Sequence, residues 1–305
     1  EKVDYLLDYL TSKSLINAYP EKFGKFDRDE SKVMNVYHIH DLTRLYAANL
    51  LRDNAEEAKF AIGRHASFFL GLGSYLNRQY KQGGERMITS LKVFRAIWPY
   101  LIDSWERMQA NQSDWPRPEL ADKWLSAFPG LCADMLQIIL SPQKRILIAE
   151  VALEIARRLN DENIVQSNLV ILGIAYDQIG DTQKAIEVLR QALTIAQESG
   201  DRFSESSIVS NLGVAYDSLN ETSTAINYYE QALVIARESK NRLSEAGAVI
   251  NIGVAYLASG LHHKAIDYFK EGLKVAQEIN DLSMESASLS NLGNAYVELG
   301  EKIKG

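Results

Sequence analysis

The sequence has little of what a secreted or membrane protein uses for stability. Cys132 is the only cysteine among 305 residues, so no internal disulfide can form, and we expect its thiol to behave as a small buried hydrophobe. No apolar run approaches the roughly 18 residues that a membrane-spanning helix requires, and no signal peptide is visible. These absences argue against a disulfide-stapled or membrane-spanning protein and predict a cytoplasmic one.

A surplus of basic residues is also missing. Residues 1–141 hold 18 Lys and Arg against 18 Asp and Glu, whereas residues 142–305 hold 15 against 22, which accounts for the whole net charge of −7. Proteins that neutralise a phosphate backbone need a clustered basic surface. We therefore expect neither nucleic acid nor a membrane among the partners.

Catalytic motifs are absent as well. The five histidines show no metal-binding spacing such as His-Glu-x-x-His. The chain contains no Gly-x-x-x-x-Gly-Lys-Ser/Thr loop for nucleotide phosphates and no Gly-x-Ser-x-Gly nucleophile motif. We predict no enzymatic activity, no metal site and no cofactor held by this chain alone.

What the chain does contain is a repeat of 40 residues in its second half. A Leu-Gly or Ile-Gly pair recurs at this spacing, a tyrosine follows each pair, and an alanine follows in the next segment. The pairs begin at Leu172, Leu212, Ile252 and Leu292; the tyrosines are Tyr176, Tyr216, Tyr256 and Tyr296; the alanines are Ala185, Ala225 and Ala265.

Each repeat reads as a pair of helices. Val209, Leu212, Gly213 and Tyr216 are spaced as one face of a helix. Gly213 costs roughly 1 kcal/mol of helix propensity relative to alanine, so its recurrence predicts the close approach of a neighbouring helix, with Tyr229 beside it. Such a pair cannot bury its apolar face alone, and the units must therefore stack.

The pattern resembles the tetratricopeptide repeat, and its longer period resembles the repeats of kinesin light chain and of many bacterial signalling proteins. The resemblance implies an α-α superhelix over residues 142–305. We place a half unit at 142–160, with Ser141 and Pro142 as its helix start, and full units starting near 164, 204, 244 and 284, the last of them truncated.

In this repeat class the first helix of each unit lines a concave groove. The acidic charge of this half favours a protein or peptide ligand with basic character. Asn211, Asn251 and Asn291 form a ladder whose amides can both donate to and accept from a peptide backbone; the alternative is that they are solvated or bonded within the repeats. The predicted groove positions are Ile171, Ile174, Asp177, Asn211, Val214, Asp217, Ile250, Asn251, Val254, Asn291 and Asn294.

The first 60 residues have a different pattern. We predict a helix over residues 4–12, a strand over 14–19, an irregular segment, a second strand over 33–40 and then a long helix that begins at Asp41. Helix, strand, loop and strand is the order found in the second half of a winged helix. Residues 1–60 are therefore predicted to be the end of a winged-helix domain with a short β-hairpin.

The string from Tyr37 to Ala47, YHIHDLTRLYA, resembles the end of the winged-helix domain in NB-ARC signalling ATPases of the STAND class. In that family a histidine before Asp-Leu contacts the β-phosphate of ADP and locks the resting state, and the matching residue here is His40. The alternative is a strand-end imidazole bonded to nearby backbone. The resemblance also covers residues 61–141, which would form the helical linker between the winged helix and the repeats. It further implies a full-length protein with an upstream nucleotide domain that binds ADP or ATP and forms a homo-oligomer on activation.

The sequence thus predicts a mainly α chain, in which a partial winged helix and a helical linker precede a repeat solenoid. Three functions compete. The first is the sensor region of a STAND signalling protein, whose repeats bind a ligand and restrain the switch. The second is a free-standing repeat adaptor without a nucleotide switch. The third is a DNA-binding winged helix, which the lack of a basic face disfavours.

Overall fold

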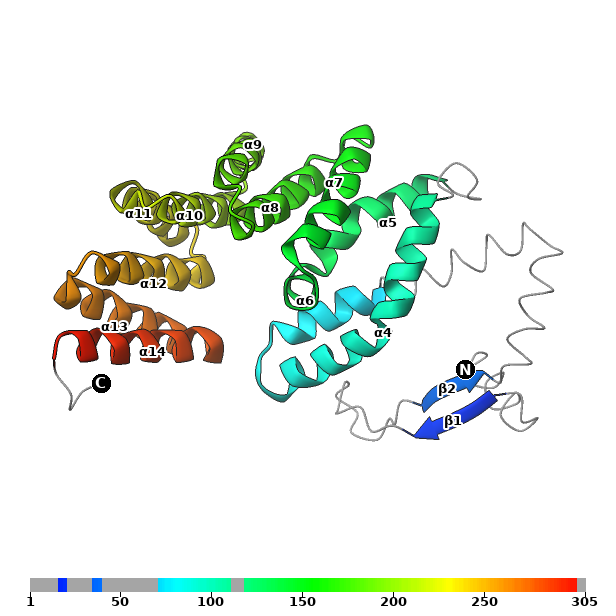
Figure 1. Cartoon of the computed structure of the whole chain (residues 1–305), viewed down its shortest axis with the longest axis horizontal. Helices are drawn as coiled ribbons and strands as arrows, with labels where there is room; N and C mark the ends of the chain where they lie inside the picture. The colour runs from blue at the N-terminus through cyan, green and yellow to red at the C-terminus, as the bar shows by residue number, and fades with distance from the viewer. Residues whose placement is uncertain (1–15, 21–34, 40–70, 111–117, 301–305) are drawn as a thin grey trace. The chain divides into compact units, whose positions relative to one another are not determined.

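The computed structural model describes residues 16–20, 35–39, 71–110 and 118–300, drawn as ribbons in Figure 1. The backbone divides into two compact units, one of residues 1–80 and 85–121 and the other of residues 81–84 and 122–305. Each unit is described by itself.

Two strands are described in the first unit. β1 (Ile16–Pro20) and β2 (Asn35–Ile39) pair antiparallel, with Ile16 opposite Ile39 and Pro20 opposite Asn35. β2 ends directly before His40, which lies outside the described residues, as do the helices predicted over residues 4–12 and from Asp41. The winged helix therefore stays a prediction.

The rest of the described first unit is helical. Residues 71–80 form a helix, and α4 (Gly84–Ala110) follows a turn in which Gly83 and Gly84 have φ angles of +73° and +58°. This left-handed backbone is one that residues with a side chain adopt only under strain. Phe94 and Trp105 are buried, whereas Trp98 is partly exposed.

The described part of the second unit contains two shorter helices, followed by a half unit of one helix, three antiparallel helix pairs and one final helix. α5 (Pro118–Leu131), whose first residues belong to the other unit, and α6 (Ala133–Ile139) precede α7 (Pro142–Arg158). The others are α8 (Glu162–Gln178), α9 (Thr182–Ser199), α10 (Arg202–Ser218), α11 (Thr222–Glu238), α12 (Arg242–Ala258), α13 (His262–Glu278) and α14 (Leu282–Glu298). The predicted stack is thus present, and each unit begins two residues earlier than the sequence predicts.

Local capping sets the helix boundaries. The Ser141 hydroxyl accepts from the backbone N–H of Lys144, and aspartate or asparagine side chains cap α8, α9, α10, α12 and α14 in the same way. Asn220, after the end of α10, has a φ of +61°, the left-handed conformation that commonly ends a helix. Asn160, Lys240 and Asn280 adopt the same conformation between units, which the sequence reading did not predict.

Within each pair, a glycine lies where the two helices come closest. A Cβ added to Gly213 would lie 2.5 Å from Tyr229 Cε1, and one added to Gly253 would lie 2.6 Å from Phe269 Cε1. Gly173 has the same relation to Leu189. The predicted reason for these glycines, the approach of a neighbouring helix, is therefore confirmed. Ala185, Ala225 and Ala265 are fully buried on the partner helices, so small side chains allow the close packing.

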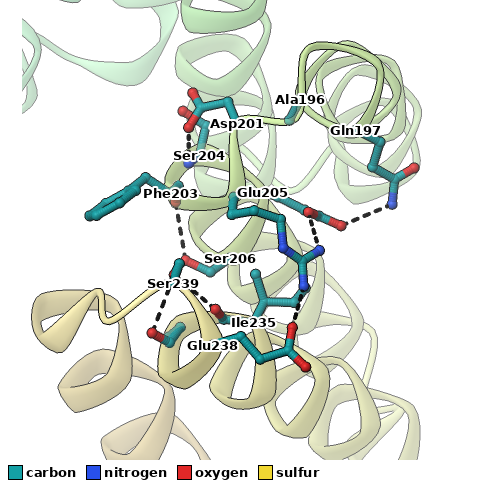
Figure 2. A network of polar contacts seen from close by, with 12 residues as sticks. Ala196, Gln197, Asp201, Phe203, Ser204, Glu205, Ser206, Ile235, Glu238 and Ser239 are labelled. Atoms are coloured by element: carbon teal, nitrogen blue, oxygen red, sulfur yellow. Dashed lines mark hydrogen bonds and ion pairs between the residues drawn. The ribbon is translucent and has the colours of Figure 1, made fainter.

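A polar network ties successive units together. Glu205 is buried at 6% exposure, and it accepts from Gln197 Nε2 of α9 at 3.2 Å and from Arg202 Nη1 at 2.5 Å. Figure 2 shows the Glu205 side chain, in the first turn of α10, directed toward Gln197 of α9, with Glu238 of α11 close by. Arg202 also pairs with Glu238. Because a buried carboxylate needs such partners, the network fixes how one pair docks on the next.

The same network recurs one unit later. Glu245 is buried, and it pairs with Arg237 of α11 and with Arg242, which reaches on to Glu278 of α13. The 40-residue period therefore governs the polar contacts between units as well as the apolar ones.

Candidate ligand-binding face

The first helices of the units, α8, α10, α12 and α14, form one continuous side of the stack. Each lies against the next one, whereas successive second helices have few close backbone contacts. Closer packing along the first helices places them on the inside of the curve. We call their solvent-facing side the inner face, and the predicted groove positions lie on these four helices.

The asparagine ladder lies on successive first helices of this face. Asn211, Asn251 and Asn291 are each partly exposed, while the leucine or isoleucine that follows each one is buried. The Asn251 side chain donates from Nδ2 to Ser210 Oγ of the preceding first helix at 3.3 Å. Ser210 thus orients the Asn251 amide, and this hydrogen bond uses the Nδ2 group and not the carbonyl oxygen.

Two carboxylates lie at the ends of the first two helices of the face. Asp177 accepts from Thr182 Oγ1 and from Ser218 Oγ of the next unit, both at 3.0 Å. Burial raises the pKa of the Asp217 carboxyl. The pKa of the Tyr229 hydroxyl is also raised, first by burial and then by the negative charges of Asp217 and Asp177. Asp177 and Asp217 thus bring two carboxyl groups to the ends of neighbouring first helices.

The apolar positions predicted for the groove do not all contribute in the same way. Val214 and Val254 are each 39% exposed and offer apolar surface, and Asn294 is also exposed. Ile250 is buried, and its Cγ1 lies so close to α13 that a Cβ on Gly272 would be 2.8 Å from it. Ile250 therefore packs between helices and offers no docking surface.

Ile171 and Ile174 line a small cavity at the beginning of the stack. This cavity has a volume of about 40 Å³, and α5, α6 and α7 supply the rest of its wall. Its polar wall includes Arg145, which the sequence reading did not single out. A signal was present, because Arg145 stands one period before Ala185, Ala225 and Ala265 and so replaces a residue that is alanine in every later unit.

The described residues contain neither a metal-binding cluster nor a membrane-spanning helix. No cluster of three or more His, Cys, Asp or Glu side chains that could hold a metal ion occurs in residues 16–20, 35–39, 71–110 and 118–300. Within the same ranges, no helix combines the length and the hydropathy needed to cross a bilayer. His40, the predicted phosphate contact, lies outside these ranges.

Comparison with protein families identifies the repeats. Residues 169–238 and residues 246–279 each match a model described as tetratricopeptide repeat. Among curated proteins, no sequence is similar enough to count as a relative.

Solved structures are similar in fold. Aspartyl phosphate phosphatase F from Bacillus subtilis matches with a TM-score of 0.56 at 14% identity, over 97% of this chain and 68% of that one. BtubC (BKLC) from P. vanneervenii matches with a TM-score of 0.54 at 22% identity, over 70% and 86%. A STAND protein with a tetratricopeptide repeat sensor from Pyrococcus horikoshii matches at 0.49 and 18%, over 95% and 48%. At these identities the matches show a similar fold and nothing more. The TM-score of the STAND protein is too low to support any conclusion.

The family matches and the 40-residue helix pairs agree on the same part of the chain. Residues 169–238 and 246–279 are tetratricopeptide repeats, stacked as an α-solenoid.

Proposed function

We propose that the inner face of α8, α10, α12 and α14 binds an extended peptide or an exposed segment of a partner protein. The asparagine ladder is the observation that carries this proposal. Three amides recur at the repeat spacing on one face, and each offers a donor and an acceptor that match a peptide group. The valines between them supply apolar contacts, and Asp177 and Asp217 favour a ligand with basic residues near them.

The ladder predicts the effect of removing two of its members. Peptides selected from a random library on the wild-type chain should bind the Asn211→Ala, Asn251→Ala double variant roughly tenfold or more weakly, because two hydrogen bonds to the peptide backbone are lost. Fluorescence anisotropy with labelled peptides measures the change.

Asn227 provides the matched control. It is an exposed asparagine on α11, a second helix, so Asn227→Ala should leave the affinity unchanged. Equal affinities for the double variant and the wild type would remove the inner face from the binding site.

A second proposal concerns the longer protein to which such a chain would belong. We propose that the repeats act as the sensor of a STAND-type nucleotide switch. The YHIHDLTRLYA string supports this, as does the β1–β2 hairpin that ends directly before His40. In this proposal ligand binding on the inner face shifts an ADP-bound resting state toward an active one. A free-standing repeat adaptor is the alternative, and a phosphate-binding loop encoded upstream of Glu1 would discriminate between them.

The switch proposal predicts the effect of His40→Ala in such a longer protein. Loss of a charge-assisted contact to the β-phosphate should weaken ADP retention by roughly tenfold to a hundredfold and raise basal activity. The nucleotide that copurifies with the protein can be quantified by chromatography. His38→Ala, two residues earlier on β2, serves as the control, and an unaltered nucleotide state in the His40 variant would contradict the assignment.

A further inference from the structure

Arg145 is a buried cation that lacks an ionic partner. Arg145 is only 5% exposed, and no carboxylate among the described residues forms an ion pair with it. Within residues 71–110 and 118–300, it donates from Nη2 to the neutral Oε1 of Gln178, while its Nε–H is buried and has no acceptor there. Burial lowers the pKa of the guanidinium, with no opposing contribution from a carboxylate.

Two other arginines of the stack have the carboxylate partners that Arg145 lacks. Arg202 and Arg242 each pair with two glutamates, which raise their pKa values. Both of those side chains are 40% exposed or more, so they need partners less than Arg145 does. Burial of a guanidinium is unfavourable unless an anion and further hydrogen bonds compensate for the lost water.

The cavity beside Arg145 is large enough for such an anion. A volume of about 40 Å³ corresponds to about three waters at 10–15 Å³ each, which is also room for a carboxylate group and the carbon that carries it. Leu136, Ile148 and Ile171 form an apolar wall, and Gln137 adds a second polar side chain. A single guanidinium can bind both oxygens of a carboxylate. A phosphate brings more oxygens and more charge, which an apolar wall would leave without partners.

We infer that Arg145 and this cavity form a seat for a carboxylate attached to a small apolar group. The carboxylate belongs either to a free organic acid or to the C-terminal residue of a peptide. Ile171 and Ile174 belong to both the cavity and the inner face, so the seat lies at one end of the proposed peptide site, and the peptide form of this inference rests on the proposed function. The net negative charge of the repeats does not prevent binding, because repulsion from distant charges is screened beyond about 8–10 Å in physiological salt.

Paired probes of equal shape test the seat directly. Propionate and propionamide differ in charge and hardly in size, and their binding to the wild-type chain can be followed by amide resonance shifts of Gln137 and Ile174. We expect saturable binding of propionate and at least tenfold weaker binding of propionamide, because the guanidinium favours the charged acceptor. Equal shifts from both probes, or no saturation with either, would overturn the inference without any variant.

A substitution then assigns the effect to Arg145. Arg145→Met keeps most of the side-chain volume and removes the charge, so propionate should bind it at least tenfold more weakly. Unchanged propionate binding by a folded Arg145→Met variant, with amide spectra like those of the wild type, would also overturn the inference.

Acetyl-glycyl-glycine and its C-terminal amide distinguish the two sources. Binding of the free acid at least as tight as propionate, with loss on amidation, would assign the seat to a peptide C-terminus. Binding of propionate alone would assign it to a free acid. A chain that binds neither carboxylate but keeps its affinity for library peptides on the asparagine ladder would lose this inference and retain the proposed function.

Discussion

Replacing Gly253 with alanine is expected to destabilise the repeats by about 1–3 kcal/mol, although alanine has the higher helix propensity. The added Cβ would lie 2.6 Å from Cε1 and 2.7 Å from Cδ1 of Phe269. The Phe269 ring is fully buried and cannot swing away into solvent. The α12 and α13 backbones must therefore separate, with loss of packing along the whole helix pair.

The last unit offers a control in which the same substitution should act in the opposite direction. Gly293 stands 40 residues after Gly253 on α14, and a Cβ there would meet no atom within 4 Å. Gly293→Ala should therefore be neutral or stabilise α14 by up to about 1 kcal/mol, from helix propensity alone.

Urea unfolding followed by circular dichroism compares the two variants. Because repeat arrays can unfold unit by unit, midpoints should be read together with amide exchange of α12 and α13. The packing described here is contradicted if the two variants have the same stability, or if Gly253→Ala is the more stable one.

The sequence was sufficient to predict the repeat units because their physics is local. Helix caps, apolar spacing and the glycine at each crossing lie within one 40-residue period, and the period itself shows which positions correspond. Gly213 beside Tyr229 could be predicted in this way, and the structure confirms it. The left-handed Lys240 could not, because lysine has no preference for that backbone and only the geometry of the turn imposes it.

The candidate site was less predictable than the fold. Helical spacing placed Val214 and Val254 on the exposed side but could not show that Ile250, next to the ladder, is buried against α13. Whether a position near the edge of a helix face is covered depends on the tilt of the neighbouring helix, and the sequence does not encode that tilt locally.

Arg145 was missed for a different reason. A single arginine in an amphipathic helix ordinarily reads as a solvated side chain, and only comparison with Ala185, Ala225 and Ala265 marks it as unusual. Its burial then depends on α5 and α6, which lie outside the repeat pattern.

Cys132 is expected to react with a thiol reagent at pH 8 at least about a thousandfold more slowly in the folded chain than in urea. Burial raises the pKa of its thiol from 9.0 to about 12, and each pKa unit lowers the reactive thiolate fraction tenfold. The side chain is also fully buried between α5 and α6, so access adds to the effect. Below pH 9 both thiolate fractions rise equally with pH and the ratio stays constant, whereas above pH 9 the ratio narrows as the unfolded thiol becomes fully ionised.

Labelling with 5,5′-dithiobis(2-nitrobenzoate) measures this ratio, and the Cys132→Ser, Ser223→Cys double variant supplies an exposed thiol on α11 as control. A native rate for Cys132 within tenfold of its rate in urea would contradict the packing of α5 and α6.

Residual labelling of Cys132 reports local opening of these helices, and the adjacent Ala133 lines the Arg145 cavity. A carboxylate that binds this cavity only while α5 and α6 are packed should therefore slow the labelling of Cys132 further. The slowing should increase with the ratio of the carboxylate concentration to its Kd.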